Sequence, residues 1–214
     1  GGSTDTFTVV LDTQPASDVV FTVSSADTGE ATVSASTLTF TNGNWNATQQ
    51  VTVTGVDDTI DDGNQNTTVT IAVDADNSDD TFDGLADQTV TATTTDDDTA
   101  AFTLSKTTVS VSEAGSTDTF TVVLDTQPAS AVVLTVASGD TGEATVSPAT
   151  LTFTNDNWNA TQTVTVTGVD DSVDDGDQDT TVTIAVDDDN SDNTFDGLAD
   201  QTVTATTTSD DDTA

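Results

Sequence analysis

The sequence contains no cysteine, no histidine and a single basic residue, Lys106. The absence of cysteine excludes a disulfide framework, a thiolate metal site and a cysteine nucleophile. The absence of histidine removes the most frequent general base and the usual zinc ligand. Nucleic acid and anionic membranes are unsuitable partners, because both bind basic surface and this chain has almost none. No apolar run approaches the roughly 18 residues of a membrane span.

Aspartate is what the chain has in abundance. Of its 39 acidic residues 36 are Asp, and the formal net charge is -38. Asp favours loops and turns and is a common oxygen ligand of hard cations, whereas helical or disordered acidic proteins normally use Glu. A chain this negative repels itself unless cations neutralise it.

Two nearly identical repeats make up the chain. Thr-Asp-Thr-Phe at residues 4–7 recurs at 117–120, and Asn-Trp-Asn-Ala-Thr at 44–48 recurs at 157–161, both at an offset of 113. Over the 92 aligned positions that start at Thr4 and Thr117 there are 14 differences. Such near-identity is typical of tandem duplication in arrays of many copies. The chain opens on no signal peptide and begins inside a motif, so we expect it to be a fragment of a longer protein.

The second repeat is the longer of the two. The run Asp-Asp-Asp-Thr-Ala at residues 96–100 recurs at 210–214, so a full unit runs from about residue 101 to residue 214. The sequence therefore predicts two domains, residues 1–98 and residues 99–214. The first repeat has no counterpart of residues 101–113, and with them it lacks the first predicted strand.

Short segments within the repeat alternate apolar residues with Thr, which is typical of half-buried strands. Clusters of Asp, Asn and Gly separate them, and no segment has helical periodicity. In the second repeat these segments are residues 106–112, 119–124, 132–136, 150–154, 163–167, 181–186 and 201–206. The pattern predicts two tandem seven-stranded antiparallel Greek-key sandwiches of the Ig-like type, with the first copy lacking its first strand.

The Asp residues gather in three loops of each repeat. One cluster follows the fifth predicted strand, and another ends the repeat. So many carboxylates in tight loops repel one another unless cations lie among them, and Ca²⁺ accepts six to eight oxygen ligands in loose geometry. We predict calcium ligands in these two clusters at Asp57, Asp58, Asp61, Asp62, Asp96, Asp97, Asp98, Asp170, Asp171, Asp174, Asp175, Asp210, Asp211 and Asp212.

Other interpretations of the acidic loops stay open at this point. The third cluster, residues 187–192, suits either calcium or an ordinary turn, since Asp-Asn-Ser runs form turns. A solvated acidic surface is the alternative for all three clusters. The EF-hand spacing fails, because Val173 falls on a ligand position when the loop starts at Asp171. The glycine-rich nonapeptide of calcium-binding β-helices is also absent.

A series of acidic positions runs through the second repeat in a fixed order. Glu113 ends the first predicted strand, Asp140 follows Gly139, the Asp pairs at 170–171 and 174–175 follow the fifth strand, and 210–212 end the repeat. In this order the repeat resembles the Calx-β module of sodium–calcium exchangers and large bacterial surface proteins. The resemblance implies that these positions, with Asp27 as the counterpart of Asp140, bind several calcium ions at one end of the sandwich. The family often has Glu where Asp174 and Asp175 stand.

The composition, the tandem copies and the Asp-rich junctions are also similar to the extender repeats of giant RTX-type bacterial biofilm and ice-binding adhesins. This resemblance implies Ig-like sandwiches in long arrays, secreted and tethered at the cell surface. We therefore expect a monomeric, calcium-stiffened spacer whose partners are neighbouring copies of the repeat. Calcium at the junction, residues 95–101, would hold consecutive domains in line.

Two further functions are weighed against the spacer. An adhesion module would itself bind a glycan or another surface ligand, and Trp45 and Trp158 are the aromatic candidates for stacking on a sugar. A lone aromatic at such a turn more often closes the end of a core, which is the interpretation we favour. A calcium sensor would need a coupled partner domain. We expect no enzyme, because identical acidic loops repeated in every unit suit a scaffold better than catalysis.

Overall fold

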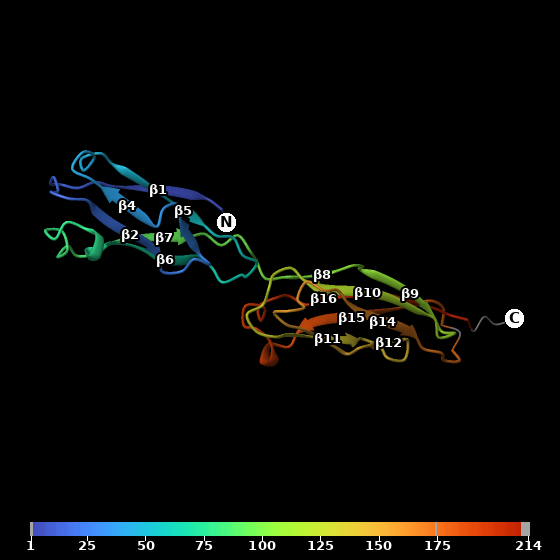
Figure 1. Cartoon of the computed structure of the whole chain (residues 1–214). Coiled ribbons are helices and arrows are strands. Elements are labelled where there is room, and N and C mark those ends of the chain that lie inside the picture. The colour runs from blue at the N-terminus through green and yellow to red at the C-terminus, as the bar shows by residue number, and fades with distance from the viewer. Residues whose placement is uncertain (1, 174, 211–214) are drawn as a thin grey trace. The chain divides into compact units, whose positions relative to one another are not determined.

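The computed structural model describes residues 2–173 and 175–210. The chain divides into two compact units, which correspond to the two repeats. Unit 1 comprises Gly1–Asp58 and Asp62–Asp97, and unit 2 comprises Thr59–Asp61 and Asp98–Ala214. Each unit is all-β apart from one short 3-10 turn, and Figure 1 shows its strands in chain order. In the described part of the chain, no helix is long and apolar enough to cross a membrane.

Unit 2 consists of two sheets. The four-stranded sheet has the order β12-β14-β10-β8, with β12 at Ala144–Ser147, β14 at Gln162–Gly168, β10 at Thr117–Leu124 and β8 at Phe102–Leu104. The five-stranded sheet has the order β13-β11-β15-β16-β9, with β13 at Thr150–Phe153, β11 at Val132–Ser138, β15 at Gln178–Val186, β16 at Gln201–Thr208 and β9 at Thr108–Ser112. The 3-10 turn η2, Asp188–Asn190, follows β15.

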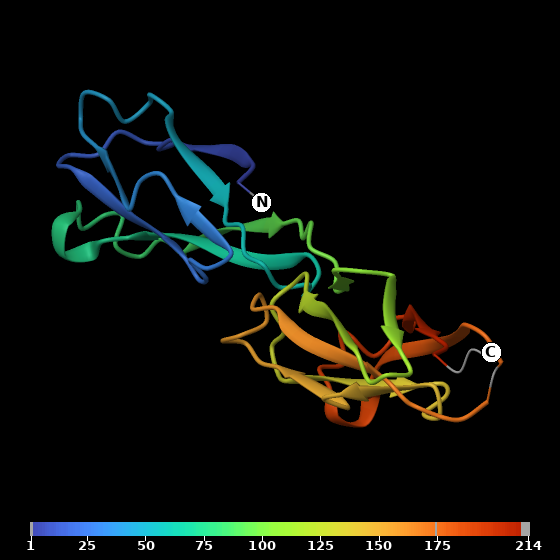
Figure 2. The same cartoon turned by 90° about the vertical axis from the view of Figure 1, so that its right-hand side faces the viewer.

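Unit 1 has the same plan with fewer strands. Its three-stranded sheet has the order β1-β5-β3, with β1 at Thr4–Val9, β5 at Gln49–Gly55 and β3 at Ala31–Val33. Its four-stranded sheet has the order β4-β2-β6-β7, with β4 at Thr37–Phe40, β2 at Val19–Ser25, β6 at Gln65–Val73 and β7 at Gln88–Thr94, and the turn η1 is Ala75–Asn77. Figure 2 gives a second view of both pairs of sheets.

Alternation along the strands builds each core. In β11 the side chains of Val132, Leu134 and Val136 are buried, and the residues between them face outward. Each of these burials contributes about 1.5–3 kcal/mol relative to an exposed side chain. Because apolar and polar residues alternate along each strand, each sheet has one apolar face. The two sheets of a unit pack with these faces together as a sandwich.

The all-β sandwich predicted from the sequence is confirmed, and its details differ. Each of the seven predicted segments of the second repeat overlaps a strand, but unit 2 also contains the short strands β8 and β12. The expectation of a purely antiparallel sandwich is wrong at one pair, because β9 runs parallel to β16. The short strands β8 and β12 escape prediction because three or four residues give too little alternation to detect.

Candidate metal centre

Glu30 lies where three chain segments of unit 1 meet. It immediately precedes β3, and its carbonyl oxygen accepts a hydrogen bond from the backbone N–H of Val56, just beyond β5, at 2.8 Å. The same oxygen accepts a bond from the Oγ1 of Thr94, at the end of β7, at 2.7 Å. Because β3 and β5 belong to one sheet and β7 to the other, the ends of both sheets hold this glutamate in place.

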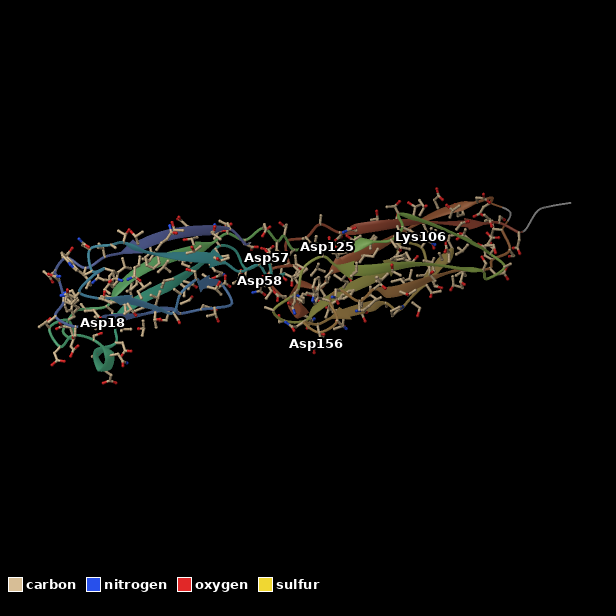
Figure 3. The ribbon with its side chains drawn as sticks, turned by 45° about the horizontal axis from the view of Figure 1, so that its top comes forward. Asp18, Asp57, Asp58, Lys106, Asp125 and Asp156 are labelled. Atoms are coloured by element: carbon tan, nitrogen blue, oxygen red, sulfur yellow. The ribbon has the colours of Figure 1, made fainter. Side chains whose placement is uncertain are left out.

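Three carboxylates come together at this position. One oxygen each of Glu30, Asp58 and Asp62 lies within 4.8 Å of the other two. Asp58 belongs to the loop that follows β5, as Figure 3 shows, and Gly63 closes that acidic run with a φ of +73°. Glu30 is half-buried, whereas Asp58 and Asp62 are exposed.

The surroundings of Glu30 disfavour its charge. Burial raises the pKa of Glu30 above the usual glutamate value, and the neighbouring carboxylates of Asp62, Asp58, Asp27 and Asp96 raise it further. Repulsion between like charges at this distance is the expected cost of a carboxylate cluster without a cation. A divalent cation would remove that cost, because it supplies the positive charge that the neighbouring side chains do not.

Unit 2 repeats the arrangement around Glu143, the residue 113 positions after Glu30. Its carbonyl oxygen accepts hydrogen bonds from the N–H of Val169 at 2.8 Å and from the Oγ1 of Thr207 at 3.1 Å. Burial again raises the pKa of Glu143, and the charges of Asp175, Asp171, Asp140 and Glu113 raise it further. The same backbone contacts thus hold Glu30 and Glu143 at the same position of the two sandwiches. Among the described residues, the group of three carboxylates within 4.8 Å is found at Glu30.

Glu113 adds a buried carboxylate to the cluster of unit 2. Its side chain is 1% exposed, and its Oε2 accepts a hydrogen bond from the N–H of Asp210 at 3.2 Å. Its own N–H donates to the carbonyl oxygen of Thr208 at the end of β16, at 3.1 Å. In the first repeat, the position aligned with Glu113 falls before residue 1.

The predicted ligands of the first repeat, residues 1–98, fall into two groups. Asp58 and Asp62 belong to the three-carboxylate group, while Asp27 and Asp96 act on Glu30 through their charges. Asp27 also accepts a hydrogen bond from the N–H of Gly29 at 2.8 Å. The group does not include Asp57, Asp61, Asp97 and Asp98, and the ligand role of those four residues stays a prediction.

In unit 2, the charges of Asp175, Asp171, Asp140 and Glu113 act on Glu143, and the ligand role of these four residues stays a prediction. Asp210 reaches this region through its backbone. Asp170 is described, and its ligand role stays a prediction. The predicted ligands Asp174, Asp211 and Asp212 lie outside the described residues.

The central residues of both clusters, Glu30 and Glu143, were not among the residues predicted from the sequence. A signal for them was present. They are two of three glutamates in a chain that otherwise uses Asp, and each follows the same Asp-Thr-Gly motif. The longer side chain reaches from the start of β3 or β12 to the loop after β5 or β14, which an Asp at the same position would not span as well.

The Asp-Asn-Ser cluster of residues 187–192 forms a hydrogen-bonded turn. Asp192, 7% exposed, accepts hydrogen bonds from the N–H of Ser130 at 2.7 Å and from the N–H of Thr194 at 3.1 Å. Burial by itself raises the pKa of Asp192, but the hydrogen bonds from Thr194 and Ser130 outweigh it and hold the pKa below its usual value. Asp79 has the corresponding role in unit 1. This observation favours the turn over calcium at the cluster.

The two tryptophans pack against the cores. Trp45 and Trp158 are partly buried and contact the core clusters of units 1 and 2 respectively. Each also accepts a backbone hydrogen bond at its carbonyl oxygen, from Leu11 and from Leu124, both at 3.2 Å. This placement agrees with the favoured interpretation that they close the end of the core.

No protein-family model matches the chain, and no curated protein matches it in sequence. Among solved structures it is similar to domains 4 and 5 of the S-layer protein SbsC, at 20% identity, a TM-score of 0.43 and coverage of 88% of this chain and 70% of that one. It is also similar to CBD12 from CALX1.2, at 11% identity, a TM-score of 0.35 and coverage of 96% and 93%. The E. coli chaperone DraB is matched over 54% of this chain and 59% of its own length, at 9% identity and a TM-score of 0.40. Likenesses at this level assign neither a family nor a function.

Proposed function

We propose that the chain is a pair of calcium-stiffened spacer repeats of a long secreted bacterial surface adhesin. In this role the repeats project a distal ligand-binding region away from the cell. Calcium binds to the clusters around Glu30 and Glu143 and to the neighbouring Asp-rich loops, and it limits motion between consecutive repeats. The Calx-β and RTX-type resemblances of the sequence favour this function.

The observation that carries the proposal is the recurrence of one acidic cluster in both repeats. In each unit a partly buried glutamate lies among several aspartates, and the chain has a single basic side chain to set against its 39 acids. That side chain, Lys106, is labelled in Figure 3. Its Nζ forms an ion pair with Asp118 at 2.6 Å. Divalent cations from solution would supply positive charge among these carboxylates.

The set of candidate ligand atoms favours Ca²⁺ over Zn²⁺. It consists of carboxylate oxygens and backbone carbonyl groups in loops, which suit Ca²⁺ better than Zn²⁺, whose sites usually include nitrogen or sulfur. Asp96 acts on Glu30 and immediately precedes Asp97, the last residue of unit 1, so an ion held there restrains the segment that leads into unit 2. By mass action, the stiffening grows with free calcium and disappears in a chelator.

Thermal unfolding and solution scattering with calcium and with chelator test the proposal. We expect calcium at 100 times its dissociation constant to stabilise each site by about 2.7 kcal/mol and to narrow the distribution of interdomain distances. The double variant Glu30→Gln, Glu143→Gln should lose most of that response. Asp156→Asn is the matched control, because Asp156 is an exposed loop acid whose counterpart in the first repeat is Gly43. Melting and scattering curves of the parent chain that are the same with calcium and with chelator would refute the spacer mechanism.

A further inference from the structure

One asparagine of the chain, Asn42, is followed by a glycine. The chain contains 11 asparagines, and the pair Asn-Gly occurs at residues 42–43 alone. Both residues are exposed and lie in the turn between β4 and β5. The corresponding turn of unit 2, between β13 and β14, has Asn155 followed by Asp156. The two repeats therefore present the same turn with a different residue after the asparagine.

The two turns form the same hydrogen bonds. The N–H of Gly43 donates to the Oγ1 of Thr41 at 3.2 Å, and the N–H of Asp156 donates to the Oγ1 of Thr154 at 3.3 Å. In both turns a glutamine side chain donates to the carbonyl oxygen of the asparagine, at 3.0 Å in unit 1 and at 3.1 Å in unit 2. The turn is thus built in the same way with glycine and with aspartate.

The fold does not require a glycine at position 43. The φ of Gly43 is not in the left-handed region, and a Cβ added there would meet the Oγ1 of Thr41 at an ordinary distance of 3.8 Å. Asp156, labelled in Figure 3, is an exposed residue at the same position of unit 2. What a glycine changes here is access to its own backbone nitrogen, because it has no side chain to shield that nitrogen or to restrict its rotation.

The side-chain amide of Asn42 is the group that this nitrogen can reach. The Cγ of an asparagine and the nitrogen of the next residue are spaced to close a five-membered ring. In the folded chain the Nδ2 of Asn42 donates to the carbonyl oxygen of Pro15 at 3.2 Å. This is a neutral hydrogen bond, whose net contribution is modest because water can replace it. Since Asn42 and Gly43 are exposed, water reaches both reacting groups.

We propose that Asn42 is a site of spontaneous deamidation through its own backbone. The nitrogen of Gly43 gives up its proton to solvent and forms a bond to the Cγ of Asn42. The bond between Cγ and Nδ2 breaks, and the amide nitrogen takes up a proton and leaves as ammonia. Water then opens the resulting succinimide ring at one of its two carbonyl carbons, which gives aspartate or isoaspartate. Water is the co-reactant, and the step involves no oxidation or reduction.

Asn155 lacks this reactivity although its turn is the same. The side chain of Asp156 shields the attacking nitrogen, and its negative charge opposes the loss of the proton from that nitrogen. The comparison between the repeats thus separates the effect of the following residue from the effect of the turn. The proposal does not depend on calcium binding or on the spacer function.

The modification loosens one end of unit 1. A carboxylate has no hydrogen to donate, so either product loses the bond from Asn42 to Pro15. In isoaspartate the main chain runs through the former side chain, which also displaces the carbonyl oxygen that accepts the Nε2 of Gln14. Because Gln14 and Pro15 belong to the segment between β1 and β2, that segment is held less firmly to the turn between β4 and β5.

Incubation of the full chain at mildly alkaline pH, followed by intact-mass measurement and peptide mapping, tests the proposal. Conversion adds the mass difference between an amide and a carboxylic acid, and fragmentation that distinguishes aspartate from isoaspartate locates it. We expect Asn42 to convert while Asn155 in the same sample stays an amide. The rate should rise with pH, because the attacking nitrogen must lose its proton. Isomerisation at the four Asp-Gly pairs of the chain leaves the mass unchanged and does not interfere.

Reciprocal exchange between the two turns supplies the controls. Gly43→Asp gives unit 1 the residue of unit 2 and should abolish conversion at Asn42, whereas Asp156→Gly should create conversion at Asn155. Asn42→Asp reproduces one product and should lower the melting temperature of the chain. No conversion at Asn42, equal conversion of both asparagines in the parent chain, or conversion that Gly43→Asp leaves unchanged would each overturn the proposal. Conversion that occurs in urea and not in the folded chain would also overturn it, because the turn would then protect the amide.

Discussion

At the scale of single residues, burial and charged neighbours raise the pKa of some carboxyl groups, and hydrogen bonds lower the pKa of others. Glu30 and Glu143 gain a raised pKa from burial and from carboxylate neighbours. Asp79 has a lowered pKa, because the hydroxyl of Thr81 and then backbone N–H groups donate hydrogen bonds to its carboxylate. The pKa of Asp192 is lowered because hydrogen bonds from Thr194 and Ser130 outweigh the effect of burial. The first pair favours binding of a cation or a proton, and the second pair anchors loops.

The lowered pKa of Asp192 makes its contribution to stability dependent on pH. A group whose pKa is lower in the folded state stabilises the fold above its unfolded pKa, about 3.9 for Asp, and loses that effect as pH falls through the folded pKa. We expect Asp192→Asn to cost about 1–3 kcal/mol near neutral pH, because the buried donors of Ser130 and Thr194 lose part of their acceptor. The cost should shrink below about pH 4.

Urea unfolding at several pH values measures this difference between parent and variant. Asp189→Asn is the control, because Asp189 lies in the same acidic run and is exposed. Its cost should be small and should vary little with pH. A cost of Asp192→Asn that is the same in acid and at neutral pH would show that the side chain acts through its shape and not through its charge.

At the scale of elements, alternation predicted the long strands, and the acidic loops between them followed from the same pattern. The cluster around Glu30 was predicted only in part from the sequence, because the approach of this glutamate, just before β3, to the loop after β5 depends on sheet pairing. Register of that kind is a tertiary property that spacing alone does not fix. The parallel pairing of β9 with β16 escaped prediction for the same reason, since those strands are separated by most of the repeat.

The close passage of β9 over Gly168 gives a matched pair of substitutions. We expect Gly168→Ala to destabilise unit 2 by about 1–3 kcal/mol, because the added Cβ overlaps the backbone of Ser112. Gly55→Ala should be neutral or slightly stabilising, since its Cβ has room and alanine has less freedom in the unfolded chain. Urea unfolding of the two variants tests the pair. Equal losses would mean that glycine is needed at this position for a reason other than β9.

At the scale of the whole molecule, comparing the two near-identical units shows what the segment that contains β8 and β9 contributes to the core of unit 2. Unit 2 has two strands, β8 and β9, with no counterpart among the described residues of unit 1, and with them it buries Phe120 and Val203 almost fully. Unit 1 keeps the same sheets but leaves Phe7 and Val90 partly exposed. Sequence comparison located the missing segment, and the structure identifies the side chains that its absence uncovers.

Unequal stability of the two units follows from this difference. We expect unit 1 to unfold first, and native-state hydrogen exchange in mild denaturant to show protection in β6 at least about tenfold below that in β15. Residues 67–73 and 180–186 have the same sequence, so intrinsic exchange rates cancel in the comparison. Equal protection of the two strands would mean that the segment containing β8 and β9 contributes little to the stability of the sandwich.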